Sequence, residues 1–180
     1  MERIEKTIVC EVPVTTAYNQ WTQFEEFPQF MEGIVQVDQL DDKRLHWVAD
    51  VAGDRKEWDA EIIDQVPDQV IAWRSITGET NHGSVKFRPL AENRCEITLL
   101  MTYEPKGIKE KIGDMLGILN ARVEGDLQRF KKFIEERQVE TGAWRGEIEG
   151  GSVNREGRPS RMGGRTHRRA KEEQEYSGSL

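Results

Sequence analysis

Residues 107–138, GIKEKIGDMLGILNARVEGDLQRFKKFIEERQ, contain the apolar repeat that decides the fold. Their apolar residues recur at steps of three and four: Ile108, Ile112, Leu116, Leu119, Val123, Leu127, Phe130 and Ile134. At 3.6 residues per turn, this spacing predicts a helix with one continuous apolar stripe. A helix of about thirty residues is roughly 45 Å long. It therefore needs a large apolar surface to pack against.

The preceding chain predicts that surface. Residues 4–12 alternate between apolar and polar, which is typical of a half-buried strand. Two short helical segments follow within residues 14–31, the second broken at Pro28. Six further strands are expected from Gly33 to Val37 and over 44–51, 55–66, 69–77, 83–90 and 94–104. Short turns rich in Gly, Asp, Asn and Pro connect most of them, so neighbouring strands should be antiparallel.

Alternation along these strands predicts which residues share a face. A two-residue turn at Pro67-Asp68 places Ile62 opposite Trp73, and it places Glu61 opposite Arg74 on the reverse face. The same reasoning sets Trp47 beside Trp58 or Ala60. One face is then dry and the other, which carries His46, is wet. The dry face collects Leu45, Trp47, Ala49, Val51, Trp58, Ala60, Ile62, Ile71, Trp73, Val85, Phe87, Ile97, Leu99, Met101 and Tyr103.

Composition divides the 180-residue chain into a domain, residues 1–138, and a tail, residues 139–180. The domain has 26 acidic and 18 basic residues, whereas the tail has seven and eight together with eight glycines. An acidic domain argues against a nucleic-acid groove. The tail lacks aliphatic periodicity and is expected to be disordered. Within it, Trp144 and Ile148 are candidates for docking back onto the domain.

Several classes of protein find no support in the sequence. No run of eighteen apolar residues is present, so no membrane span is expected. The N-terminus alternates from its first residues, unlike a signal or transit peptide, which favours a cytoplasmic location. Cys10 and Cys95 are then expected to be free thiols. Two isolated cysteines and three scattered histidines predict neither a metal site nor a bound cofactor.

Three stretches resemble a known family: VPVTTAYNQWTQFEEFPQFM (12–31), EWDAEIIDQVPDQVIAWRS (57–75) and LMTYEPKG (100–107). They look like the START-like (SRPBCC) superfamily, in its polyketide cyclase/dehydrase and coenzyme-Q-binding branch. The resemblance covers residues 1 to about 138. It implies an α+β helix-grip fold, in which a curved, antiparallel, seven-stranded sheet wraps around a long C-terminal helix. It also implies a deep apolar cavity that holds a hydrophobic small molecule.

The expected ligand-binding residues come from the dry face and the helix. Trp47, Trp58 and Trp73 are either core residues or the flat wall of a cavity, and both interpretations remain open. Tyr103, Ser75 and Lys56 are candidates for orienting a polar end of the ligand. The remaining candidates supply apolar contact area: Phe87, Leu99, Met101, Leu116 and Leu119.

By this assignment the dry face holds no His, Asp or Glu. General acid–base catalysis needs a titrating group inside the pocket, so the sequence favours a binding protein over an enzyme. A cyclase or dehydratase that positions a polyketide-like substrate is the alternative. A structural or stress-related dimer is a second alternative. Small residues recur every fourth position on the long helix (Gly113, Gly117, Ala121 and Gly125), which fits a homodimer contact, a helix that lifts to admit ligand, or simple tolerance by packing.

Overall fold

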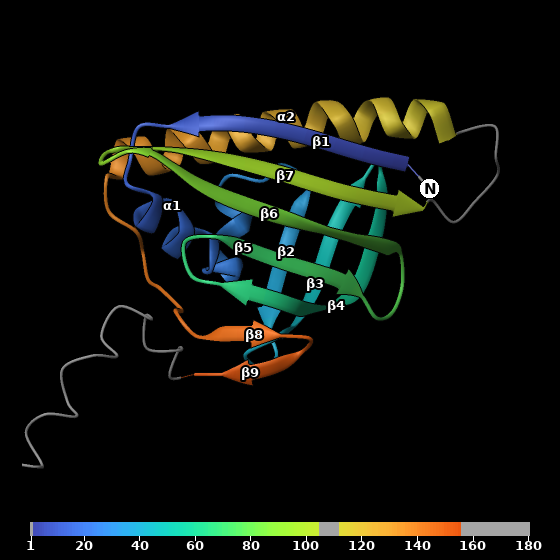
Figure 1. The fold of residues 1–180 in the computed structure, drawn as a ribbon. Helices are drawn as coiled ribbons and strands as arrows, with labels where there is room; N and C mark the ends of the chain where they lie inside the picture. The colour runs from blue at the N-terminus through green and yellow to red at the C-terminus, as the bar shows by residue number, and fades with distance from the viewer. Residues whose placement is uncertain (1, 105–111, 156–180) are drawn as a thin grey trace, which may run out of the picture.

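The computed structural model describes residues 2–104 and 112–155 and shows the expected α+β fold (Figure 1). Two short helices follow the first strand, and the long helix follows the seventh. The elements are β1 Glu2–Cys10, α1 Val14–Trp21, the 3-10 helix η1 Phe24–Gln29, β2 Ile34–Gln39, β3 Arg44–Val51, β4 Asp54–Val66, β5 Val70–Ser75, β6 Thr80–Ala91, β7 Arg94–Glu104, α2 Ile112–Arg137, β8 Glu147–Glu149 and β9 Ser152–Asn154.

Seven antiparallel strands form the main sheet in the order β1-β7-β6-β5-β4-β3-β2. The predicted pairs are confirmed, with Ile62 opposite Trp73 and Trp47 opposite Trp58. The turn between β4 and β5 was expected to have two residues but has three, 67–69, and Val66 pairs with Val70. An irregularity between Ile62 and Asp64 bends β4 and shifts its pairing with β5. In Figure 1 the sheet is strongly curved, and α2 runs along β1 at one side of it. This arrangement is the helix-grip fold.

The apolar stripe of α2 faces the sheet, as its spacing predicted. Leu119, Val123, Leu127, Phe130 and Ile134 are all buried. The helix was expected over 107–138 and is observed from Ile112 to Arg137, and residues 107–111 lie outside the described part of the chain. Packing of this stripe, rather than intrinsic helix propensity, provides most of the stability of such a helix.

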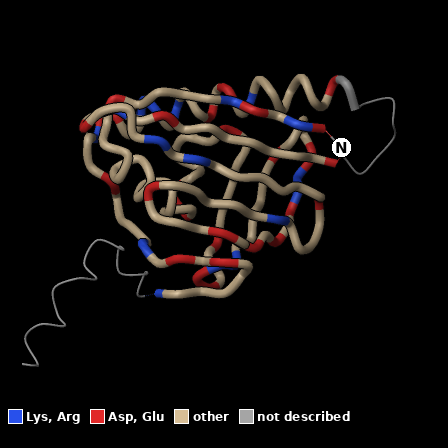
Figure 2. Tube along the Cα trace, viewed as in Figure 1, with Lys and Arg blue, Asp and Glu red and all other residues tan. Residues whose placement is uncertain are grey.

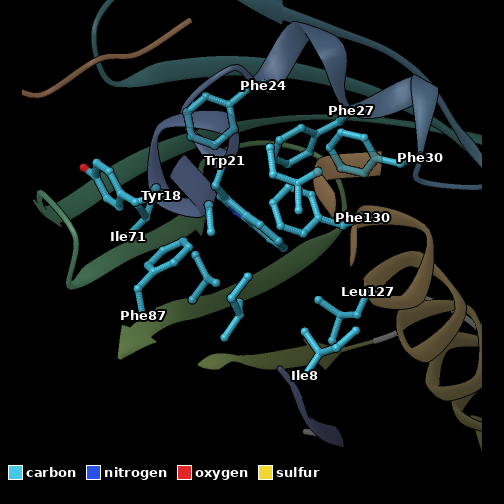
Figure 3. Packing of buried hydrophobic residues seen from close by; sticks show 14 of the residues in the cluster. Ile8, Tyr18, Trp21, Phe24, Phe27, Phe30, Ile71, Phe87, Leu127 and Phe130 are labelled. Atoms are coloured by element: carbon cyan, nitrogen blue, oxygen red, sulfur yellow. The ribbon is translucent and has the colours of Figure 1, made fainter. Parts of the chain in front are cut away.

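The two short helices close one end of the space between the sheet and α2. Their aromatic side chains gather around Trp21, whose ring makes edge contacts with Phe27, Phe87 and Phe130 (Figure 3). Phe30 contacts Phe130 from the other side, with ring centroids 5.2 Å apart. Edge-to-face aromatic pairs of this kind pack densely. This end of the molecule is therefore a solid core.

The folded unit continues past residue 138, where the sequence placed its boundary. Ile148 of β8 is only 1% exposed and pairs with Gln65 at the edge of β4, beyond the end of β3. The backbone N–H of Trp144 donates a hydrogen bond to the Thr22 hydroxyl. Residues 139–155 therefore belong to the domain, and the expected disordered tail was assigned too early a start. Residues 156–180 of that expected tail lie outside the described residues.

Charged residues of both signs are interspersed along the strands and α2 (Figure 2). On the wet face, Glu61 pairs with Lys43 and Arg74, and these contacts lower its pKa. His46 also lies on this face, as expected, where its ring nitrogen Nδ1 is 2.7 Å from Asp59 Oδ1. The outer face of the sheet is therefore polar and faces solvent, whereas its inner face consists mostly of apolar residues.

Candidate ligand-binding cavity

A cavity of about 190 Å³ lies between the curved sheet and α2. It borders the aromatic core at α1 and η1, whose Trp21, Phe24 and Phe27 line one end of it. Strands β3, β4, β5 and β7 supply one wall, and Leu119, Val123 and Leu127 of α2 supply the other. The sheet wall is mostly apolar: Leu45, Trp47, Ala49, Val51, Trp58, Ala60, Ile62, Ile71, Trp73, Leu99 and Met101.

The three tryptophans of the sheet all line this cavity. The rings of Trp47 and Trp58 are parallel to within 2°, with centroids 6.0 Å apart. Trp47 also contacts Phe27 of the solid core edge to face. The Trp73 indole N–H donates a hydrogen bond of 2.9 Å to Asn81 Oδ1. These contacts fix the ring orientations, so the cavity has flat, rigid walls, and Trp47 belongs to both the core and the cavity.

One end of the cavity is polar. Tyr103 Oη donates a hydrogen bond of 3.3 Å to Glu79 Oε2, and Lys56 Nζ lies 3.4 Å from Glu79 Oε1. The Glu79 side chain is only 14% exposed. Burial, followed by the nearby charge of Glu79, raises the pKa of Tyr103 to about 12. The phenol therefore remains protonated at neutral pH and can donate a hydrogen bond.

A second polar group comes from α2. Asp126 is buried, and its Oδ1 accepts hydrogen bonds from the Glu32 backbone N–H at 2.8 Å and from the Arg129 guanidinium. Burial raises the pKa of the Asp126 carboxyl despite these partners. Arg122 Nη1 donates to the Asp50 carbonyl oxygen at 2.6 Å, which connects α2 to the end of β3. All of these residues except Asp50 and Arg129 line the cavity.

Eight of the eleven expected site residues line the cavity: Trp47, Trp58, Trp73, Leu99, Met101, Tyr103, Lys56 and Leu119. The other three lie elsewhere. Phe87 is part of the solid core, with its ring centroid 5.3 Å from that of Tyr18. The Ser75 hydroxyl accepts a hydrogen bond from the Asn81 backbone N–H. Leu116 packs against the buried apolar cluster.

Sequence reasoning missed the acidic residues of the cavity. It found no Asp or Glu on the dry strand face, but Glu79 enters from the turn between β5 and β6. Alternation assigns faces only within strands, so it could not place a turn residue. Asp126 adjoins Leu127 on the apolar stripe of α2, and this position was a usable signal. The cavity is therefore less uniformly apolar than expected.

The part of the chain that the structure describes offers no cluster of three or more His, Cys, Asp or Glu side chains suited to a metal ion. No helix among residues 2–104 and 112–155 is long and apolar enough to cross a membrane. Cys10 and Cys95 are both buried free thiols, and burial raises the pKa of Cys10 to about 12.

Comparison with known proteins gives the same fold. An uncharacterized 17.2 kDa protein of Streptomyces lincolnensis, from the melC2-rnhH intergenic region, is 49% identical over 149 residues, which are 82% of this chain and 99% of that protein. The crystal structure of the Zhui aromatase/cyclase from Streptomyces sp. R1128 superposes with a TM-score of 0.66 at 17% identity, covering 76% of this chain and 94% of that one. A START superfamily protein from Mycobacterium smegmatis superposes with a TM-score of 0.58 at 13% identity, covering 75% of this chain and 95% of that one.

The family match covers most of the sheet and the long helix. Residues 10–132 match the family described as "Polyketide cyclase / dehydrase and lipid transport". This range begins at the last residue of β1 and ends within α2. The resemblance to the polyketide cyclase/dehydrase branch is therefore confirmed, and the chain belongs to the polyketide cyclase/dehydrase and lipid transport family.

Proposed function

We propose that this protein binds a hydrophobic small molecule in the cavity between its sheet and α2. The observation that carries the proposal is the hollow itself, which is walled by indole and aliphatic side chains. Most ligand sites combine such a lining with a few polar groups that fix orientation. Here Tyr103, Lys56 and Asn81 are the candidates for that second role. The two free, buried thiols support a reducing, cytoplasmic setting.

The volume of the cavity limits the size of the ligand that it can hold. An apolar cavity of about 150 Å³ is enough to hold benzene, and this one has about 190 Å³. The parallel rings of Trp47 and Trp58 favour a flat guest. We propose a ring-containing ligand of the lipid, quinone or polyketide type, with one or two fused rings inside and any longer chain outside.

A polyketide cyclase or dehydratase is the second candidate. One of the structural neighbours is named an aromatase/cyclase. The specific observation in favour is the partly buried carboxylate of Glu79, hydrogen-bonded to Tyr103 inside the cavity. General acid–base catalysis needs a titratable group of this kind, positioned inside the pocket. An enzyme of this type would still bind its substrate in the cavity proposed here.

Native mass spectrometry of freshly purified protein tests the binding proposal. We expect a bound mass that is lost under denaturing conditions, or, in protein stripped by solvent extraction, saturable binding of 2-naphthol. Ala49 lines the cavity and is 2% exposed, so Ala49→Phe should fill the hollow and reduce this binding at least tenfold.

Leu90 is 40% exposed, so Leu90→Phe adds the same ring outside the cavity and should leave binding unchanged. Near-ultraviolet circular dichroism checks that both variants are folded. Wild-type protein that carries no guest and binds no 2-naphthol at millimolar concentration would contradict the proposal. Equal binding by the two variants would move the site away from this cavity.

A further inference from the structure

We infer that Glu79 and Tyr103 form a proton-transfer pair that converts a ring-bearing ketone, bound in the cavity, into its enolate. The inference rests on the proposed function, because the ketone must occupy the same cavity. It assigns a reaction step and two residues to the polar end of that cavity. No metal or redox cofactor takes part in the step.

The geometry gives the two oxygens of Glu79 different partners. Oε1 lies 3.4 Å from Lys56 Nζ, whereas Oε2 accepts the hydrogen bond from Tyr103 Oη at 3.3 Å. Lys56 thereby anchors the carboxylate through one oxygen and leaves the other directed toward the phenol. The bond to Tyr103 is long for an O–H···O bond, for which about 2.7–2.8 Å is usual. A ligand oxygen can therefore replace Glu79 as the acceptor at little cost.

This spacing fits a ketone and its neighbouring carbon. The carbonyl oxygen and the α-carbon are separated by a single carbon atom, so groups one hydrogen bond apart can reach both. In the step, Glu79 Oε2 takes the α-proton, and the C–H electron pair forms the new C=C bond. The carbonyl π pair moves to oxygen, where the Tyr103 O–H donates a hydrogen bond to the enolate. Return of a proton from Glu79 to the α-carbon restores the ketone.

The surroundings favour this step over simple hydrogen bonding. The raised pKa of Tyr103 keeps its hydroxyl proton in place as a donor. The apolar walls strengthen its interaction with a developing oxyanion, because such interactions are worth more where water is excluded. The ring of Trp73, fixed by Asn81, helps to form the wall of the same cavity. The flat wall can hold the ring system while the carbonyl points to Tyr103.

Hydrogen exchange of 1-tetralone in D₂O tests the inference, because this bicyclic ketone has a single enolisable carbon. Proton NMR measures the loss of its C2 protons with and without the full-length protein. We expect the wild type to accelerate exchange over buffer. Glu79→Gln and Tyr103→Phe should each reduce the protein-catalysed rate at least about tenfold, since such groups typically contribute 10²–10⁴-fold. Both should retain 1-tetralone affinity within about threefold.

A matched control is available on β4, on the outer face of the sheet. Glu57 is exposed and lies outside the cavity lining, so Glu57→Gln should leave the exchange rate unchanged. Wild-type protein that binds 1-tetralone without accelerating exchange would overturn this inference and leave the binding proposal standing. Exchange that survives Glu79→Gln but disappears in Lys56→Met would also overturn it, because the amine would then be the reactive group. Failure to bind either 1-tetralone or 2-naphthol would contradict both proposals.

Discussion

The two ends of the space between the sheet and α2 differ in how completely side chains fill them. At the α1 end, Trp21, Phe27 and Phe30 fill the space between β6 and α2. At the other end the described residues place no short helix, and Trp58, Trp73 and Tyr103 line about 190 Å³ of open space. The same two layers therefore make a solid core at one end and a hollow at the other.

The comparison separates stability from binding in this fold. Close packing at the solid end is worth several kcal/mol per large side chain, because a deletion leaves a void. Side chains at the hollow end already face a void, so their removal costs fewer contacts. Substitutions at the solid end should therefore lower the stability of the fold, whereas substitutions at the hollow end should mainly change ligand affinity. Each of the following experiments tests one side of this contrast.

The largest effect is expected at the centre of the solid end. Phe130 is fully buried against Trp21 and Phe30, so Phe130→Ala should lower the free energy of unfolding by about 3–5 kcal/mol. Met101→Ala at the hollow end should cost less than half as much. Urea denaturation followed by circular dichroism measures both. Equal losses at the two positions would show that the ends do not differ in packing.

The C-terminal strap, residues 139–155, should be nearly as important for stability as the core. Ile148 is 1% exposed and packs within the main buried cluster, so Ile148→Ala should cost about 2–4 kcal/mol. Val153 of β9 is 38% exposed, and Val153→Ala should cost under about 0.5 kcal/mol. The same denaturation experiment applies. If Ile148→Ala leaves the urea midpoint of unfolding unchanged, the segment after residue 138 does not contribute to the stability of the domain.

A smaller effect, on affinity rather than stability, is expected at the hollow end. Trp58 supplies half of the stacked indole pair, so Trp58→Ala should weaken 2-naphthol binding about tenfold, or about 1.4 kcal/mol. Trp144 lies outside the cavity lining, and Trp144→Phe should leave affinity unchanged. Isothermal titration calorimetry gives both values. Unaltered affinity for Trp58→Ala would exclude that ring from the site.

The outer side of α2 should gain stability from a small substitution. Gly117 is exposed, and a Cβ atom there would meet nothing within 4 Å. Gly117→Ala should therefore add up to about 1 kcal/mol through helix propensity alone. Sedimentation of Gly117→Leu separates this effect from a dimer contact. A sedimentation coefficient that falls from dimer to monomer would show that the glycine serves an interface.

The smallest effect is a pH dependence on the wet face. The hydrogen bond and charge of Asp59 raise the pKa of His46 above its ordinary value. The stabilisation from protonated His46 is thus fully present below about pH 6.5 and lost as pH rises through the folded-state pKa. Because the pair is partly exposed, it should amount to less than about 1 kcal/mol. His46→Gln should remove this slope from the pH dependence of unfolding, and a retained slope would assign it to another group.

Much of the fold could be predicted because its signals are local and periodic. The spacing of residues 107–138 predicted the face of α2. The pair Ile62–Trp73 was also predicted, although the turn has three residues (67–69) rather than two, because the irregularity between Ile62 and Asp64 offsets the extra residue. The three-residue strands β8 and β9 are too short to show any periodicity, so these strands were missed, although Trp144 and Ile148 were expected to dock on the domain and do so.

The site was harder to predict because alternation assigns a face but not a position along the cavity. Phe87 and Leu99 share the dry face, but only Leu99 borders the hollow, since α1 and η1 cover the end where Phe87 lies. The docking position of those helices depends on tertiary packing. Glu79 was missed for a different reason, because it belongs to a turn and its direction follows from the geometry of β5 and β6.

The central claim is that the cavity accepts a guest while residues outside its lining do not respond. The five tryptophans provide the most direct measurement, through the indole N–H signals in ¹⁵N-resolved NMR spectra recorded as 2-naphthol is added. We expect the signals of the four tryptophans that line the cavity, Trp21, Trp47, Trp58 and Trp73, to shift with one common dissociation constant. The signal of Trp144 should stay in place. If none of the four cavity signals moves at saturating 2-naphthol, the account is contradicted.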